Sequence, residues 1–195
     1  MPKSPTTTTS VTRREWLALS GGALATAAAA ASAPSAAWAQ APKRGGTLNL
    51  KLWDPPHWDP QLTISYKTHI ALSFTHSRLL RHKAGPSVVP GTFPLEGDLA
   101  ESWEQPDPKT LVFKLRSGVA FHDGTPFDAE VAAWNMLRVR DHAKSQWKTQ
   151  LAVLESAEAL NKSTLRLTLK TPSPGFLRSM GYASGARVYM VSKAA

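Results

Sequence analysis

The sequence contains no cysteine among its 195 residues. This absence excludes a disulfide framework, thiol-based catalysis and cysteine-ligated metal centres. It also excludes a lipoprotein signal, because such a signal ends at the cysteine that receives the lipid. The fold must therefore be held together without covalent cross-links.

Signatures of enzymes and of nucleic-acid-binding proteins are missing as well. There is no G-x-S-x-G or H-E-x-x-H motif, the usual marks of a hydrolase site. The formal charge is +9, from 23 Lys+Arg against 14 Asp+Glu, but the basic residues are scattered and not interleaved with aromatic residues as in a nucleic-acid groove. None of the six histidines has a partner at the spacing of a metal site with nearby carboxylates. We therefore expect no nucleic-acid partner, no metal site and no cofactor.

The one long run of small and apolar residues is at the N-terminus. Arg13-Arg14 precede a stretch of Ala, Leu, Ser and Gly that ends at a small-residue cleavage site, residues 37–39. A second cleavage site is possible at residues 39–41. A charged region, an apolar region and a cleavage site, in this order, are typical of a signal peptide.

A membrane-spanning helix is the alternative interpretation of this run. The run contains Pro34, is rich in Ala and Gly, and has no anchoring residues on its far side, so it would make a poor span. We predict that residues 1–39 are a removable twin-arginine signal peptide, exported by the Tat translocase. Residues 40–46 would be a linker, and residues 47–195 would fold in the periplasm.

Local patterns predict an α/β domain after the linker. Residues 47–52 alternate apolar and polar side chains, which predicts a strand. Residues 54–60 contain three prolines and predict a rigid loop, because proline lacks an N–H group and restricts the residue before it. Residues 61–80 follow a helical pattern, and residues 84–97, rich in Gly and Pro, predict a second loop.

Two hairpins and a helix are expected in the second half of the chain. Residues 111–121 and residues 154–170 each alternate around a turn, which predicts the two hairpins. Between them, Asp128 is a suitable N-cap for a helix. The apolar residues of this helix recur at helical spacing: Val131, Trp134 and Leu137.

The stretch GVAFHDGTPFDAE, residues 118–130, places a histidine, two aspartates and a glutamate close together. Such groups could serve acid–base chemistry. Asp123-Gly124, however, is a turn dipeptide, Asp128 is a helix cap, and Glu130 complements the helix dipole. Only His122 is left without a structural role, so we interpret the stretch as scaffold. The alternative is an exported hydrolase that uses His122 and Asp123.

Four features occur in a distinctive order along the chain. They are Gly45-Gly46-Thr47-Leu48, a loop with two Asp-Pro steps, the segment DLAESWEQPDPKTLVFKLRSGVAFHDGTPFDAE at residues 98–130, and Val191-Ser192-Lys193-Ala194. In this order they resemble the N-terminal part of the family 5 solute-binding proteins of ABC importers, the dipeptide-, oligopeptide- and nickel-binding group. The resemblance extends from about Gly45 to Ala195.

The resemblance implies a type II periplasmic binding protein, an α/β fold whose two lobes close on a ligand. Family members are far longer, so this chain is expected to hold the first lobe only, incomplete, with a mixed sheet, β-hairpins and flanking helices. The implied function is that of a monomeric, non-enzymatic protein that captures a peptide or similar small solute, or a nickel or chelator-type ligand. The solute would then pass to ABC permease subunits in the inner membrane.

The resemblance also implies which residues contact the ligand. The loop after the first strand faces the cleft in this family, which nominates Trp53, His57 and Trp58. Trp147 stands where nickel-binding relatives carry a cleft tryptophan, and Arg187 where they place an arginine that pairs with a ligand carboxylate. An arginine suits that role because its guanidinium offers two parallel donors. The alternative is that the aromatic residues pack in the core or the loop and that Arg187 is simply exposed.

Overall fold

The computed structural model describes residues 45–181 and 188–194. The predicted signal peptide, residues 1–39, lies outside the described residues, as does the predicted ligand contact Arg187. Of the predicted linker, the two described residues, Gly45 and Gly46, have no regular secondary structure.

The chain divides into two units, Met1–Asn49 and Leu50–Ala195. The described helices and strands all belong to the second unit. Within the described ranges, no helix is both long enough and apolar enough to cross a membrane.

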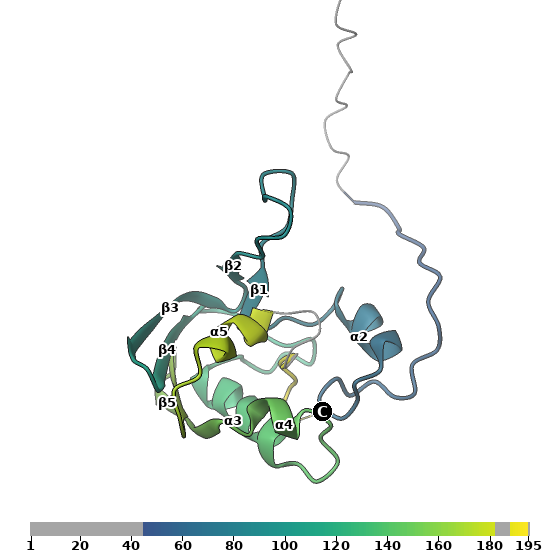
Figure 1. Cartoon of the computed structure of the whole chain (residues 1–195). Coiled ribbons are helices and arrows are strands. Elements are labelled where there is room, and N and C mark those ends of the chain that lie inside the picture. The colour runs from purple at the N-terminus through teal and green to yellow at the C-terminus, as the bar shows by residue number, and fades with distance from the viewer. Residues whose placement is uncertain (1–44, 182–187, 195) are drawn as a thin grey trace, which may run out of the picture. The chain divides into compact units, whose positions relative to one another are not determined.

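A four-stranded antiparallel sheet forms one layer of the second unit (Figure 1). Its strands, in spatial order, are β3 (Ala100–Asp107), β4 (Thr110–Leu115), β6 (Thr164–Leu169) and β5 (Leu154–Asn161). Two hairpins, β3–β4 and β5–β6, are therefore joined through the β4–β6 pair. All pairs of described strands are antiparallel, so the parallel pairs of a mixed sheet are not found among the residues that the structure describes.

Alternation in the two central strands determines which face of the sheet is buried. Leu111 and Phe113 of β4 stand opposite Leu167 and Leu165 of β6, and all four side chains are at most 1% exposed. Burying each such side chain stabilises the fold by roughly 1.5–3 kcal/mol. The residues between them point to the other face because successive side chains of a strand alternate. The predicted hairpin at residues 154–170 is confirmed as β5–β6.

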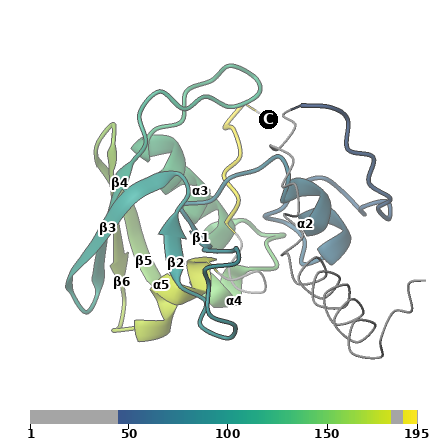
Figure 2. The ribbon, with the colours of Figure 1, turned by 90° about the horizontal axis from the view of Figure 1, so that it is seen from above.

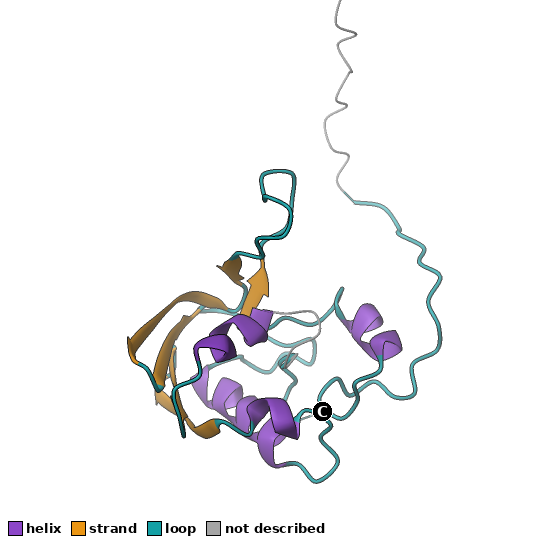
Figure 3. Cartoon of the chain, in the orientation of Figure 1, coloured by secondary structure: helices purple, strands orange, loops and turns teal. Residues whose placement is uncertain are grey.

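Helix α3 (Ala129–Asp141) packs on the buried face of the sheet (Figure 3). It begins as predicted after Asp128, whose Oδ1 accepts a hydrogen bond from the backbone N–H of Val131 at 2.9 Å. The predicted apolar stripe, Val131, Trp134 and Leu137, is only half buried. The buried residues of α3 lie beside that stripe: Ala129, Ala132, Ala133, Asn135, Met136 and Val139. Because the buried face of α3 lies to one side of this stripe, the side chain of Trp134 is not in the core but lines a pocket beside the helix.

Shorter elements complete the unit. They are α2 (Tyr66–Leu72), β1 (Leu80–His82), β2 (Leu95–Gly97), α4 (Lys148–Leu151) and α5 (Pro174–Gly181). The helix predicted at residues 61–80 is thus reduced to α2. The loop predicted at residues 84–97 is also shorter, because its last residues pair with β1. The C-terminal segment, residues 188–194, runs between α3 and α2 (Figure 2).

Two strand predictions are wrong. Residues 47–52 form no strand, and their three leucines are exposed. An alternating segment becomes a strand only when a neighbouring strand takes up its hydrogen bonds. Residues 119–121 are not the second strand of a hairpin either, since β4 pairs with β3. Ala120 makes a single isolated bridge to Pro126 instead.

The predicted turn at Asp123-Gly124 is confirmed. Gly124 has a φ of +82°, a conformation that glycine adopts without strain, and its N–H donates to the carbonyl of Phe121 at 3.0 Å. The Oδ1 of Asp123 accepts the N–H of Thr125 at 2.9 Å. The turn places His122 and Asp123 on the edge of the same hollow that Trp134 faces.

Candidate ligand pocket

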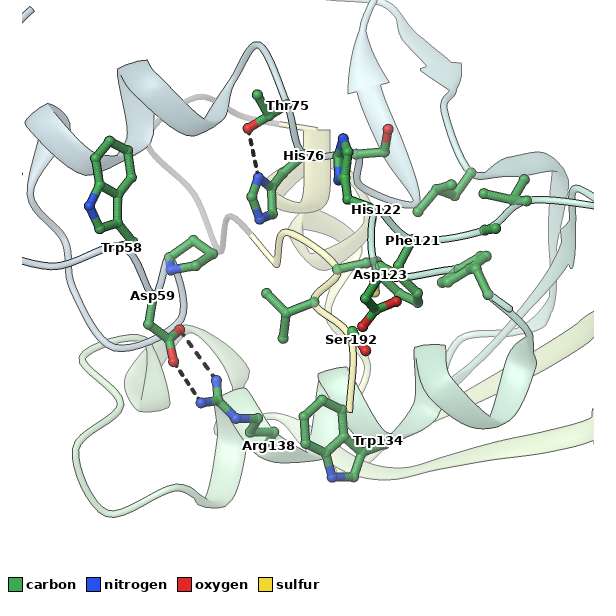
Figure 4. Close-up of a pocket in the computed structure, with 18 residues that line it drawn as sticks. Trp58, Asp59, Thr75, His76, Phe121, His122, Asp123, Trp134, Arg138 and Ser192 are labelled. Carbon is green, nitrogen blue, oxygen red and sulfur yellow. Dashed lines mark hydrogen bonds and ion pairs between the residues drawn. The ribbon is translucent and has the colours of Figure 1, made fainter. Parts of the chain in front are cut away.

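A pocket of about 520 Å³ lies in the second unit (Figure 4). Its main walls come from five separate stretches of the chain: residues 58–60, residues 75–77, residues 119–127, helix α3 and residues 190–192. Its lining combines apolar groups, including the rings of Phe121 and Phe127, with charged and hydrogen-bonding groups. Small-molecule sites combine these two kinds of surface and have volumes in this range.

One wall is fixed by an ion pair between Asp59 and Arg138. The guanidinium donates to both carboxylate oxygens, at 2.6 Å from Nη2 and 3.3 Å from Nη1, and lies 5.7 Å from the centre of the Trp134 ring. Burial acts to raise the pKa of Asp59, but hydrogen bonds from Arg138 and from the backbone N–H of Gln61 outweigh it and lower the pKa. The two opposite charges therefore neutralise each other at the pocket wall.

A buried amide network lies behind this pair. Gln61 is fully buried and donates from Nε2 to the Oδ1 of Asn135 at 2.6 Å and to the carbonyl of Tyr189 at 2.9 Å. Its Oε1 accepts from Arg138 at 2.6 Å. Asn135 in turn accepts the N–H of Val191 and donates to the Val191 carbonyl, both at 2.9 Å. The network attaches the C-terminal segment to α3 although that segment belongs to no sheet.

Ser192 links the end of the segment to the Asp123 turn. The hydroxyls of Ser192 and Thr125 are 3.1 Å apart, and the Thr125 hydroxyl donates to Asp123 at 2.6 Å. Hydrogen bonds from Ser192, and then from Thr125, lower the pKa of Asp123. In the described part of the chain, no hydrogen bond joins Asp123 to His122. The structure therefore gives the hydrolase alternative no acid–imidazole pair.

Two histidines, His76 and His122, line the pocket. Nδ1 of His76 lies 2.9 Å from the Thr75 hydroxyl, and the His76 ring is edge-on to Tyr189 with centroids 6.2 Å apart. His122 extends from the neighbouring wall (Figure 4). Burial, and then the proximity of His122, lower the pKa of His76, so this imidazole is neutral at neutral pH. Among the described residues, no three His, Cys, Asp or Glu side chains are arranged to hold a metal ion.

Of the predicted ligand contacts in the proline-rich loop, Trp58 lines the pocket. Trp53 does not, since its side chain is 61% exposed and packs edge-on against Tyr66 at 5.9 Å. His57 is not part of the pocket lining either, and its Nδ1 accepts the backbone N–H of Asp59 at 3.2 Å. The loop thus contributes one of its three predicted residues to this pocket.

Trp147 lies in the core. Its side chain is 5% exposed, and its indole N–H donates to the carbonyls of Pro60 and Thr63, each at 3.1 Å. In this position it supports the loop that forms one wall of the pocket. Arg187 lies outside the described residues.

Much of the polar lining was not predicted from the sequence. Trp134 and Arg138 are four residues apart, so they share one helix face, and an aromatic residue next to a cation there could have indicated a polar site. Nothing in the sequence near His76 marks it as a pocket residue.

Comparison with solved structures places this fold among the periplasmic binding proteins. One similar structure is the binding protein MoaA in complex with mannopinic acid from A. tumefaciens R10, with a TM-score of 0.60 and 26% identity over 70% of this chain and 27% of that chain. Another is the ABC transporter-associated periplasmic binding protein DppA from Helicobacter pylori in complex with peptide STSA, with a TM-score of 0.56 and 27% identity over 70% and 29%. The predicted type II binding-protein fold is confirmed.

The sequence match is more specific. Residues 94–194 match the bacterial extracellular solute-binding proteins, family 5 Middle, and the chain belongs to this family. The nickel-binding periplasmic protein of Escherichia coli (strain K12) is 34% identical over 155 residues, which cover 78% of this chain and 26% of that protein. The chain thus spans about a quarter of the length of this relative.

Proposed function

We propose that the protein is the periplasmic substrate-binding component of an ABC importer. It captures a peptide or similar small solute and delivers it unchanged to the membrane permease. The observation that carries the proposal is the pocket of about 520 Å³, whose main walls come from five separate stretches of the chain. The chain that forms this pocket belongs to a family of solute-binding proteins. A pocket of this volume suits a small solute.

Location and partners belong to the same proposal. The paired arginines followed by small apolar residues support export by the Tat translocase and cleavage near residue 39. The description of the E. coli relative as periplasmic supports the destination. The description of H. pylori DppA as ABC transporter-associated supports permease subunits of the inner membrane as partners. The mature protein is proposed to act as a monomer.

Trp58 is the proposed aromatic contact with the solute, because the family pattern and its place on the pocket wall agree. Trp53, His57, Trp147 and Arg187 are proposed as contacts on the family pattern alone. For Trp147, the two hydrogen bonds of its indole favour an indirect role, in which it supports the loop at Pro60.

Calorimetric titration of the full-length protein tests this function. The probes are the tetrapeptide STSA, mannopinic acid, and nickel(II) with and without L-histidine, and each probe is analysed by mass spectrometry after the titration. Saturable heat with an unchanged probe is the expected result for at least one of them. Cleavage of the peptide would support the hydrolase alternative and contradict the proposal, as would the absence of any saturable heat.

A further inference from the structure

The guanidinium of Arg138 uses only part of its hydrogen-bonding capacity within the protein. The end of the group donates to the carboxylate of Asp59, at 3.3 Å from Nη1 and 2.6 Å from Nη2. The second hydrogen of Nη1 donates to Oε1 of Gln61 at 2.6 Å. The third edge, where Nε–H lies beside the second hydrogen of Nη2, has no acceptor among the described residues. Two parallel N–H groups are therefore available to a ligand.

The contact with Gln61 has a fixed direction, because the other partners of this amide determine its orientation. Oδ1 of Asn135 accepts the N–H of Val191 at 2.9 Å, so this atom is an oxygen. It also accepts from Nε2 of Gln61 at 2.6 Å, and the carbonyl of Tyr189 accepts from the same nitrogen at 2.9 Å. The oxygen of the Gln61 amide must then face Arg138. Since the edges of a planar guanidinium point in different directions, the free edge points away from this buried amide.

The plane of the guanidinium is held by Trp134. Its central carbon lies over the indole ring, 5.7 Å from the ring centre, within the range of a cation–π contact. Figure 4 shows Arg138 between Asp59 and Trp134 at the wall of the pocket. Asp59, Gln61 and Trp134 thus occupy two edges and one face of the group. The third edge and the opposite face remain to line the pocket.

The charge of Arg138 is already balanced by Asp59, which it contacts at 2.6 Å. A ligand carboxylate on the free edge would lie close to the Asp59 carboxylate, and two like charges at short range repel each other. Asp123 adds a further negative charge to the lining, and the groups of Thr125 that donate to it are uncharged. Among the described residues of the lining, Arg138 is the one Lys or Arg side chain. The free edge therefore suits a neutral acceptor better than an anionic one.

We propose that Nε–H and Nη2–H of Arg138 donate to a neutral carbonyl oxygen of the solute, as in an amide group. One carbonyl oxygen has two lone pairs and can accept both hydrogen bonds. The proposal rests on the proposed function, because it assigns ligand chemistry to the same pocket. An apolar group next to the carbonyl would lie against Phe121 and Phe127, whose rings belong to the same lining. Arg138 thus selects an amide over a carboxylate as long as Asp59 is ionised.

Three small probes with the same benzyl group test this assignment. N,N-dimethylphenylacetamide has a neutral carbonyl oxygen and no N–H group. Its thioamide analogue has nearly the same shape, but sulfur is a weaker acceptor, and phenylacetate is an anion. Their dissociation constants for the full-length protein are measured by NMR titration at neutral pH. We expect the amide to bind about fivefold more tightly than the thioamide, the gain typical of one hydrogen bond. It should bind about tenfold more tightly than phenylacetate, which Asp59 repels.

The Nε–H signal of Arg138 reports the hydrogen bond itself. The protein is labelled with ¹⁵N-arginine, and the signal is assigned as the one that R138K removes. The amide should shift this signal with the same dissociation constant that the other resonances give. The thioamide should shift it less at saturation, because its sulfur attracts the proton more weakly.

Two variants assign the effect to Arg138 and its charge partner. R138K keeps a positive charge beside Asp59 but lacks the two parallel donors, so it should abolish the preference for the amide over the thioamide. D59N removes the charge that balances Arg138 and should reverse the order of the amide and phenylacetate. R166K is the matched control, because Arg166 is paired with Glu158 outside the pocket lining. If R138K does not fold, the wild-type comparison and D59N still decide.

The inference is overturned if the amide and the thioamide bind the wild type equally, if phenylacetate binds it most tightly, if the Nε–H signal of Arg138 does not move, or if no probe binds. Each of these outcomes can occur while STSA or mannopinic acid still binds unchanged, and the proposed function then stands alone. An amide preference that depends on Arg138, together with cleavage of STSA, would uphold the inference and contradict the proposed function.

Discussion

Asn135 pairs with Val191 as a residue of one strand pairs with a residue of the next. Its Oδ1 accepts the N–H of Val191 and its Nδ2 donates to the Val191 carbonyl, both at 2.9 Å. Asparagine is a poor helix former, because its amide competes for backbone hydrogen bonds. In the middle of α3, this amide is instead used to attach a segment that belongs to no sheet among the described residues.

Replacing Asn135 with Ala should lower the free energy of unfolding by about 3 kcal/mol, because the backbone N–H and carbonyl of Val191 lose their partner and the buried amide of Gln61 loses one of its two acceptors. Urea unfolding monitored by circular dichroism measures this difference. Gln150→Ala, at an exposed site in α4, is the control and should change stability by less than about 0.5 kcal/mol. Similar losses in both variants would mean that the amide network contributes little.

Asp128→Ala should destabilise the protein by about 1 kcal/mol through loss of the N-cap hydrogen bond to Val131. Asp128→Asn is the matched control, since asparagine caps a helix as well as aspartate does. The same unfolding measurement applies. An equal loss in the asparagine variant would show that charge at this position matters more than the cap.

The cap, the Asp123-Gly124 turn and the β5–β6 hairpin could be predicted because each depends on a few consecutive residues. The strand expected at residues 47–52 does not form, because strand formation depends on a partner that the alternating pattern does not specify. The local sequence indicates which secondary structure a segment favours. For a strand, the presence of a neighbouring strand decides whether that structure forms.

Most of the pocket could not be predicted for a related reason. Gln61 and Asn135 are polar, and in isolation each would be assigned to the surface. Both are fully buried, because they satisfy each other and the carbonyl of Tyr189, 128 residues from Gln61 in sequence. Contacts over such separations follow from the assembled fold.

Because of the ion pair between Asp59 and Arg138, the free energy of unfolding should depend on pH in the acidic range. The pKa of Asp59 is lower in the folded protein than its ordinary value of 3.8, so the ionised carboxylate contributes stability above that value. This contribution is lost as the pH falls through the lower, folded pKa. Asp59→Asn should therefore be less stable than the wild type at pH 7, with a smaller difference in strong acid.

Urea unfolding of both proteins at neutral pH and near pH 3 measures this effect. Asp54→Asn, at an exposed position in the same loop, is the control and should show no comparable change with pH. A difference between Asp59→Asn and the wild type that stays constant with pH would contradict the assigned role of the ion pair.

Replacing Arg13 and Arg14 with Lys should leave the precursor in the cytoplasm, since the Tat route depends on the paired arginines. Fractionation of cells that express the complete chain, with detection by antibody, measures the periplasmic share. Replacement of Lys3 with Arg is a suitable control and should not change export. Normal periplasmic accumulation of the double variant would remove the Tat assignment and leave the signal peptide itself in place.

The central claim is that the pocket between the Trp58 loop and α3 receives the solute, and the indole signals of the tryptophans test it most directly. Trp58 and Trp134 line the pocket, whereas Trp103 of β3 does not. The full-length protein, labelled with ¹⁵N-tryptophan, is titrated with the STSA peptide and with mannopinic acid, and each signal is assigned by Trp→Phe replacement. We predict that the signals of Trp58 and Trp134 shift and saturate with at least one of these solutes while that of Trp103 stays in place. Saturable shifts confined to Trp103, with Trp58 and Trp134 unchanged, would contradict the account.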